Sequence, residues 1–218
     1  MSETFEIARK NMVVNQLRPN KINEENILQI FENTPKENYL DVSLGKNCYL
    51  DNNLDITDKR GYLKNLHLAQ IIKYSKILPN DKVLHIGGLT GYFSALIGSL
   101  CGELNVVEEN RELFKLLEHN INTVNTNVSL FNHNLLDGLS DKAPFNLIII
   151  DGPIFKITDK LKKQLAMNGA RLIYIKKIYD NLGKAYKIIR NEDLYSSEYL
   201  FDVMSSYQIQ EQQEDFKF

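Results

Sequence analysis

The chain has 218 residues, of which 43% are hydrophobic and 25% charged, a balance that excludes the disordered and membrane-embedded classes. Its 26 basic and 28 acidic side chains give a net charge of -2, which offers no electrostatic footprint for nucleic acid or anionic lipid. The N-terminus carries no apolar signal segment, and no apolar run approaches the ~20 residues that span a bilayer, so we expect a cytoplasmic protein.

Helices and an irregular segment are expected in the first third of the chain. Helical spacing of apolar residues, Asn as a capping residue and Pro as a helix breaker are the signals that we use. The expected elements are a helix over 5–17 that ends at Arg18-Pro19-Asn20, a helix capped by Asn23 that ends before Pro35, an irregular covering segment over 40–62 and a helix over 65–77.

Short apolar runs then alternate with amphipathic helices, which predicts a mostly parallel sheet with helices on both faces and antiparallel strands at its C-terminal end. The expected strands cover 83–86, 104–107, 128–131, 145–150 and 171–175, the expected helices cover 92–100, 111–122 and 159–165, and two closing strands over 185–189 and 199–204 are joined by the polar segment 190–197.

We expect one α/β domain over 1–218. The pattern changes near residue 80, which separates an N-terminal helical and covering region (1–79) from a Rossmann-like core (80–218). No internal repeat, low-complexity tract or Pro/Ser-rich linker indicates a further boundary.

A glycine-rich turn, Gly87-Gly88-Leu89-Thr90-Gly91, follows the first strand of the expected sheet and begins a helix. In doubly wound folds such a turn leaves backbone amides free to meet a ligand. A tight strand-to-helix crossing that binds nothing has the same sequence pattern, so the turn alone leaves both interpretations open.

Three polar residues follow later strands, at the edge where open α/β sheets bind ligands. Glu108, seventeen residues after Gly91, can accept hydrogen bonds from both hydroxyls of a ribose, or it can simply be a solvated acid that begins a helix. Asp151 is either a ligand-crevice residue or a helix cap. Asn134 carries an amide that could pair with an adenine edge.

The sequence predicts neither a metal site nor a catalytic nucleophile. Cys48 and Cys101 lie far apart without ligand spacing, and we expect unpaired, partly buried thiols. None of the four histidines, His67, His85, His119 and His133, has a partner at metal-binding spacing. His85 occupies a strand end where nucleotide-binding folds often carry an acid, and it can equally be a core imidazole.

Taken in order, these residues resemble the protein-L-isoaspartate O-methyltransferase family along nearly the whole chain. Val83 to Tyr92 is similar to the family's first cofactor motif, and Glu108 falls on its ribose-binding acid. The other matching segments are Asn11-Met12-Val13, Gln16-Leu17-Arg18-Pro19-Asn20, the stretch Thr34 to Tyr39, the residues Tyr49, Asp51, Leu54 and Ile56, Ala143-Pro144-Phe145-Asn146 before Asp151-Gly152, and Gln164-Leu165 with Gly169.

The resemblance implies a Rossmann-like fold, S-adenosylmethionine as methyl donor, and transfer to the carboxylate of L-isoaspartyl residues in damaged proteins. A carboxylate is already ionised at neutral pH, so the enzyme has to align it and exclude water without a metal or strong base. The implied cofactor-binding residues are Gly87, Gly88, Gly91, Tyr92, Glu108, Asn134 and Asp151.

The chain departs from the family pattern at three positions. His85 replaces an acid, Leu89 replaces a glycine that could adopt a positive φ, and Leu63 stands where a functional hydroxyl is expected. Tyr62 or Asn65 could replace that hydroxyl in catalysis. These departures motivate an alternative, a non-catalytic or substrate-diverged binding protein of the same fold. A dinucleotide-dependent oxidoreductase ranks last, because the full G-x-G-x-x-G pattern is missing.

Overall fold

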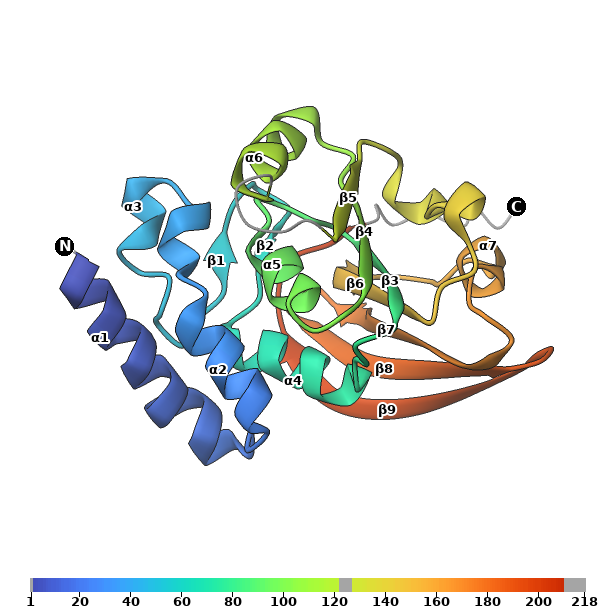
Figure 1. Ribbon diagram of the computed structural model, residues 1–218, viewed down its shortest axis with the longest axis horizontal. Helices are drawn as coiled ribbons and strands as arrows, with labels where there is room; N and C mark the ends of the chain where they lie inside the picture. Colours follow the sequence, from blue (N-terminus) through green and yellow to red (C-terminus); the bar gives the residue numbers. More distant parts are fainter. Residues whose placement is uncertain (1, 122–126, 210–218) are drawn as a thin grey trace.

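The structure, a computed structural model, describes residues 2–121 and 127–209. Its centre is a seven-stranded sheet with the strand order β5-β4-β3-β6-β7-β8-β9, and the hairpin of β1 and β2 lies beside it near the N-terminal helices (Figure 1). The strands are β1 (Leu54–Asp55), β2 (Gly61–Tyr62), β3 (Lys82–Ile86), β4 (Glu103–Val107), β5 (Val128–Phe131), β6 (Leu147–Ile154), β7 (Asn168–Tyr179), β8 (Leu182–Asn191) and β9 (Leu194–Met204).

Five neighbouring strands, from β5 to β7 in the sheet order, run parallel, whereas β8 and β9 are antiparallel to their neighbours. The expected sheet is therefore confirmed. The last two strands are longer than predicted, because Glu192 and Asp193 alone connect them and most of the polar segment 190–197 lies within strands. An antiparallel strand at a sheet edge can face water, so its polar residues do not end it.

The helices also follow the expected order. Most of them end within a few residues of the predicted positions, and the predicted residue Asn122 lies outside the described residues. The helices are α1 (Ser2–Met12), which continues through a π turn (Val13–Leu17) and a 3-10 turn (Arg18–Asn20), α2 (Glu25–Asn33), α3 (Val42–Gly45), α4 (Asn65–Ser75), α5 (Tyr92–Gly98), α6 (Arg111–Ile121) and α7 (Asp159–Lys163), with further 3-10 turns over Lys36–Tyr39, Leu135–Asp137 and Ser140–Lys142.

Asn23 does not cap α2, and this prediction was wrong. Glu24 is the N-cap residue, and the backbone N–H of Asn23 donates to Glu24 Oε2 at 3.0 Å. Asn23 lies one residue too early for its side chain to reach the first free N–H groups of the helix. The covering segment over 40–62 is largely irregular as expected, although it contains α3 and the strands β1 and β2.

Alternate residues of the central strands enter two different cores. Val83 of β3 belongs to the core beneath α1, α2, α4, α5 and α6, and the next residue, Leu84, belongs to the core beneath α7. Phe31 of α2 and Tyr62 of β2 are fully buried in the first of these cores. The N-terminal region thus contributes directly to the packing that supports the sheet, where each large apolar side chain contributes about 1.5–3 kcal/mol.

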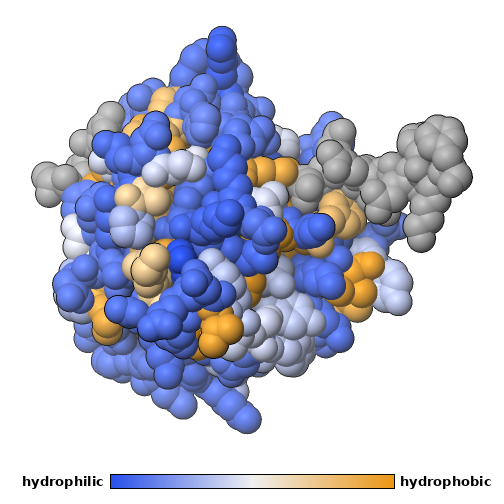
Figure 2. Space-filling view, turned by 90° about the vertical axis from the view of Figure 1, so that its right-hand side faces the viewer, coloured by the Kyte–Doolittle hydropathy of each residue, from blue (hydrophilic) through white to orange (hydrophobic). Residues whose placement is uncertain are grey.

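The face that carries α7 and the tip of the β8–β9 hairpin is mostly hydrophilic, with small separate hydrophobic spots (Figure 2). Within residues 2–121 and 127–209, no helix has both the length and the apolar composition to cross a membrane.

Candidate functional site

The glycine turn connects β3 to α5 at the carboxyl edge of the parallel strands. Gly87 and Gly91 have φ angles of 99° and 102°, and Gly87 N donates to Val107 O of the neighbouring strand at 2.9 Å. A Cβ added to Gly88 would lie 2.7 Å from the Val106 side chain of β4 and 2.9 Å from Leu117 of α6, and one added to Gly91 would meet α6 side chains at 3.1 to 3.4 Å. A Cβ on Gly87 would instead lie 3.4 Å from Arg60 Nη2, Asp151 O and Ile209 Cδ1. Gly87 therefore faces Arg60, Asp151 and Ile209, whereas Gly88 and Gly91 permit close packing against α6.

Leu89 adopts the positive φ that its position in the turn requires, at 49°. A left-handed conformation costs a non-glycine residue about 1–2 kcal/mol. The side chain is 1% exposed and packs in the core on the α5 face, which offsets this cost. The isobutyl group thus lies in the core, and the Leu89 N–H donates to Glu108 Oε2 at 2.9 Å.

Tyr62 supports the same turn from β2. Its hydroxyl accepts hydrogen bonds from Thr90 N at 3.2 Å and Tyr92 N at 3.0 Å and shares one with Thr90 Oγ1. Burial raises the pKa of the Tyr62 hydroxyl above its ordinary value. The Tyr92 ring, edge-on to Tyr62 at 5.9 Å, is buried in the core, and the predicted contact of this residue with the cofactor stays a prediction.

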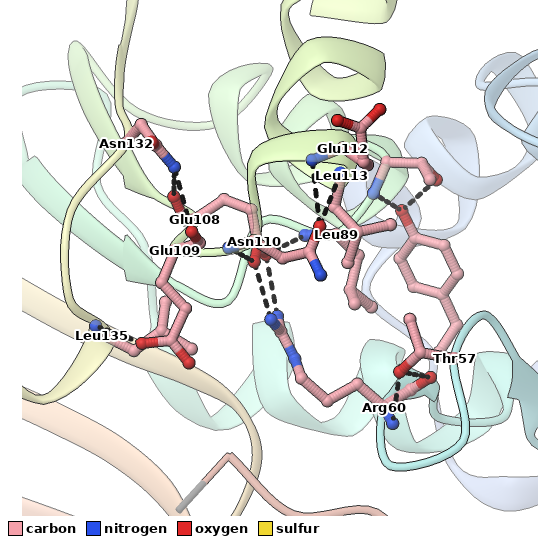
Figure 3. A network of polar contacts seen from close by, with 12 residues as sticks. Thr57, Arg60, Leu89, Glu108, Glu109, Asn110, Glu112, Leu113, Asn132 and Leu135 are labelled. Atoms are coloured by element: carbon pink, nitrogen blue, oxygen red, sulfur yellow. Dashed lines mark hydrogen bonds and ion pairs between the residues drawn. The ribbon is translucent and has the colours of Figure 1, made fainter.

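Glu108 follows β4, as predicted, and is fully buried. Its carboxylate makes a bidentate ion pair with Arg60, which reaches in from the β1–β2 connection with N–O distances of 2.7 and 2.8 Å (Figure 3). Two backbone amides, of Leu89 and Asn110, donate to the same oxygens at 2.9 and 3.0 Å. The interpretation of Glu108 as a solvated acid is wrong, because the side chain is 0% exposed.

Asp151 lies within β6, which continues through Gly152 and Pro153 past a register shift. The helix-cap alternative is wrong, since α7 is capped by the Thr158 side chain. Both carboxyl oxygens of Asp151 are buried and have no hydrogen-bond partner within the described part of the chain. The closest basic group is His85 Nε2, 3.8 Å away.

His85 is buried among aromatic and polar side chains of α5. Its Nδ1 hydrogen-bonds to Ser94 Oγ at 2.9 Å and its ring meets Phe93 edge-on, while Nε2 has no hydrogen-bond partner among residues 2–121 and 127–209. The structure therefore brings a histidine from β3 and a carboxyl group from β6 together beneath the glycine turn.

Asn65 and Asn134 have internal partners. Asn65 accepts from Lys36 Nζ at 3.0 Å and donates to Cys48 O at 3.1 Å. Asn134 caps a 3-10 turn by accepting from Leu136 N at 3.0 Å. This cap uses only the amide oxygen of Asn134, and the proposed contact of its amide with an adenine edge stays a prediction.

Two cations near Glu108 and Tyr62, the half-buried Arg60 and the fully buried Lys36, were missed by sequence reasoning. Arg60 lies in a connection between two-residue strands, and Lys36 lies in the Pro-Lys-Glu stretch, where a charged side chain is typical of the surface. Lys36 Nζ lies 5.3 and 5.2 Å from the ring centroids of Tyr62 and Tyr92, and burial lowers the pKa of Lys36 to about 8. The ion pair between Arg60 and Glu108 could not be predicted from local sequence patterns, because 48 residues separate the two positions.

Comparison with known proteins gives a consistent result. A family model described as protein-L-isoaspartate(D-aspartate) O-methyltransferase matches residues 8–204. A protein-L-isoaspartate O-methyltransferase of Koribacter versatilis is 29% identical over 170 residues, which cover 78% of this chain and 77% of the relative. The protein of that name from Shewanella woodyi is 28% identical over 199 residues, with 91% and 92% covered.

A solved structure titled protein-L-isoaspartate O-methyltransferase has the same fold. It superposes with a TM-score of 0.77 at 18% sequence identity and covers 90% of this chain. The chain spans 65% of the length of that solved structure.

Proposed function

Because this chain belongs to the protein-L-isoaspartate(D-aspartate) O-methyltransferase family, we propose that it transfers a methyl group from S-adenosylmethionine to the carboxylate of L-isoaspartyl residues in damaged proteins. The observation that carries the proposal is the buried carboxyl group of Asp151, whose oxygens have no hydrogen-bond partner within the described part of the chain. Strand β3 separates Asp151 from Glu108, and the backbone oxygen of Asp151 lies 3.4 Å from the place of a Cβ on Gly87. A buried acceptor without a donor is costly unless a ligand satisfies it.

The side chains present suit this cofactor chemically. Asp151 offers two unpaired oxygens to a cationic group, Glu108 offers a carboxylate of the kind that binds ribose hydroxyls, and Gly87 leaves room for a close approach. The cofactor would supply an electrophilic methyl group. Glu108 can bind the ribose hydroxyls only after Arg60 has left its carboxylate.

The acceptor needs little chemical activation by the chain. A carboxylate is ionised at neutral pH, so its methylation requires alignment and exclusion of water rather than a strong base. Tyr62 and Asn65 are fully buried and hydrogen-bonded to the glycine turn and to Lys36. We therefore give them a positioning role in place of the direct one that the sequence suggested.

One unit carries this activity in our proposal. Leu17 and Phe31 from the N-terminal region share a core with Leu96 of α5, so residues 1–79 and 80–218 support the site together. The alternative of a non-catalytic or substrate-diverged protein is less well supported, because the family match spans both regions.

The test is methyl transfer to a peptide with one L-isoaspartyl residue, measured against the same peptide with an ordinary aspartyl residue. We expect transfer to the first peptide only. Asp151→Asn should raise the KM for S-adenosylmethionine about 10-fold or more, because a hydrogen bond to a charged group contributes about 1.5–3 kcal/mol. Asp137→Asn, which changes an exposed ion pair with Lys160, is the matched control. Equal or absent transfer to both peptides would refute the proposal.

A further inference from the structure

The carboxylate of Glu108 has no acceptor capacity left in this structure. A carboxylate has about four lone-pair sites. Oε1 accepts from Arg60 Nη1 and Asn110 N, and Oε2 accepts from Arg60 Nη2 and Leu89 N. Two of the four donors belong to the rigid edge of the sheet, and the other two belong to a side chain from the β1–β2 connection.

Arg60 presents these two donors as a parallel fork, which is the geometry that matches a carboxylate. Two adjacent ribose hydroxyls would need the same pair of acceptor sites. Arg60 also lies over Gly87, with Nη2 3.4 Å from the place of a Cβ on that residue. The guanidinium thus occupies both the acceptor sites and the adjoining space.

A segment near the C-terminus holds this arrangement in place. Gln208 N donates to Lys59 O at 3.0 Å, Ile209 N donates to Pro153 O at 2.9 Å, and the Tyr207 hydroxyl donates to Asp55 at 2.7 Å. The Ile209 side chain lies 2.9 Å from the place of a Cβ on Gly152. Residues 207–209 therefore tie the β1–β2 hairpin to β6.

We propose that Arg60 is an internal competitor of the cofactor, a residue that sets cofactor affinity by occupying the ribose-binding carboxylate until the hairpin withdraws. The inference rests on the proposed function. When a competent state is only a fraction of the population, the apparent dissociation constant rises by the inverse of that fraction. If Arg60 is paired with Glu108, which we call the closed arrangement, in 90–99% of the molecules, cofactor binding is weakened about 10- to 100-fold. Tyr62 belongs to β2 of this hairpin, so movement of the hairpin also reaches the turn that Tyr62 supports.

The experiment is calorimetric titration of the wild-type protein and Arg60→Gln with S-adenosylhomocysteine, which needs no acceptor. Glutamine removes the charge and the fork, so the variant should bind about 10-fold tighter or more. Arg18→Gln removes an exposed Arg18–Glu25 ion pair away from the crevice and should bind like the wild type. Equal or weaker binding by Arg60→Gln overturns the inference and leaves the proposed function intact. Absence of binding by all three proteins overturns both.

A second measurement uses the wild-type protein and so does not depend on the folding of a variant. Phenylglyoxal modifies accessible arginines, and the Arg60 side chain is only 12% exposed in the closed arrangement. Peptide mass mapping should show that S-adenosylhomocysteine increases the labelling of Arg60 and leaves that of Arg18 unchanged. Unchanged or reduced labelling of Arg60 in the presence of bound ligand would overturn the inference.

Discussion

Lys36 is a fully buried cation whose surroundings are almost all neutral. Its ammonium donates to Asn65 and faces the rings of Tyr62 and Tyr92. Burial lowers its pKa to about 8, and the nearby Asp151 carboxylate partly counters that shift. Burial also raises the pKa of Cys48 to about 12, so this thiol offers no thiolate partner at neutral pH. Lys36 is therefore a group for which folding carries an electrostatic cost.

This cost predicts the pH dependence of stability. Below pH about 8 both states hold the proton, and the cost is present in full. Between about 8 and 10.5 the unfolded chain binds more protons than the native one, so the free energy of unfolding rises with pH. Urea unfolding should show a gain of about 2 kcal/mol from pH about 7.5 to about 9.5 that Lys36→Met lacks. Parallel curves for the two proteins would contradict the burial of a charged Lys36.

The sequence located single residues only where the topology decides their place. Glu108 and Asp151 could be predicted near the carboxyl edge of the sheet, because the carboxyl ends of parallel strands meet there. The unpaired state of Asp151 and the contact with His85 could not, because they depend on side-chain positions in three dimensions. The role of Arg60 could not be predicted, since its partner Glu108 is distant in the sequence.

The β1–β2 hairpin is the element that, in our proposal, determines whether the Glu108 carboxylate is free to bind the cofactor. It consists of two residues per strand and carries Arg60 in its connection. Gly61 makes this pairing possible, because a Cβ there would lie 2.3 Å from Leu54 O and 2.6 Å from the Tyr207 ring. A side chain at this position must push both β1 and Tyr207 away, or displace β2 itself.

Gly61→Ala should therefore destabilise the protein by about 1–3 kcal/mol, the usual cost of overpacking. Gly45→Ala is the matched control, because a Cβ there would meet only Glu37 at an ordinary contact distance of 3.6 Å. Denaturant unfolding of both variants provides the measurement. A Gly61→Ala variant as stable as Gly45→Ala would show that the hairpin is not packed as described.

Central strands were the elements that the sequence predicted best. β3, β4 and β5 begin and end within one residue of their predicted bounds, because apolar runs covered on two faces have clear ends. β6 was predicted too short, since Gly152-Pro153 looks like a turn and a register shift accommodates it. β1 and β2 have only two residues each, which is too few for an alternating pattern of apolar residues to be recognised.

At the scale of the whole molecule, the N-terminal region and the sheet form a continuous support for the site. α1 and α2 pack on the same core as α4, α5 and α6, on one face of the sheet (Figure 1). Two residues of the N-terminal region contact the glycine turn: Tyr62 accepts a hydrogen bond from it, and the Arg60 guanidinium lies over Gly87. The division near residue 80 thus marks a change of pattern in the sequence, and both parts contribute side chains to the proposed cofactor site.

The central claim is that this chain binds S-adenosylmethionine at the carboxyl edge of β3, β4 and β6. Calorimetric titration of the wild-type protein with the product S-adenosylhomocysteine tests it most directly, because the product occupies the cofactor site without an acceptor. The account predicts saturable one-to-one binding that Asp151→Asn weakens about 10-fold or more. No binding at millimolar ligand, or equal binding by the wild-type protein and Asp151→Asn, would contradict it.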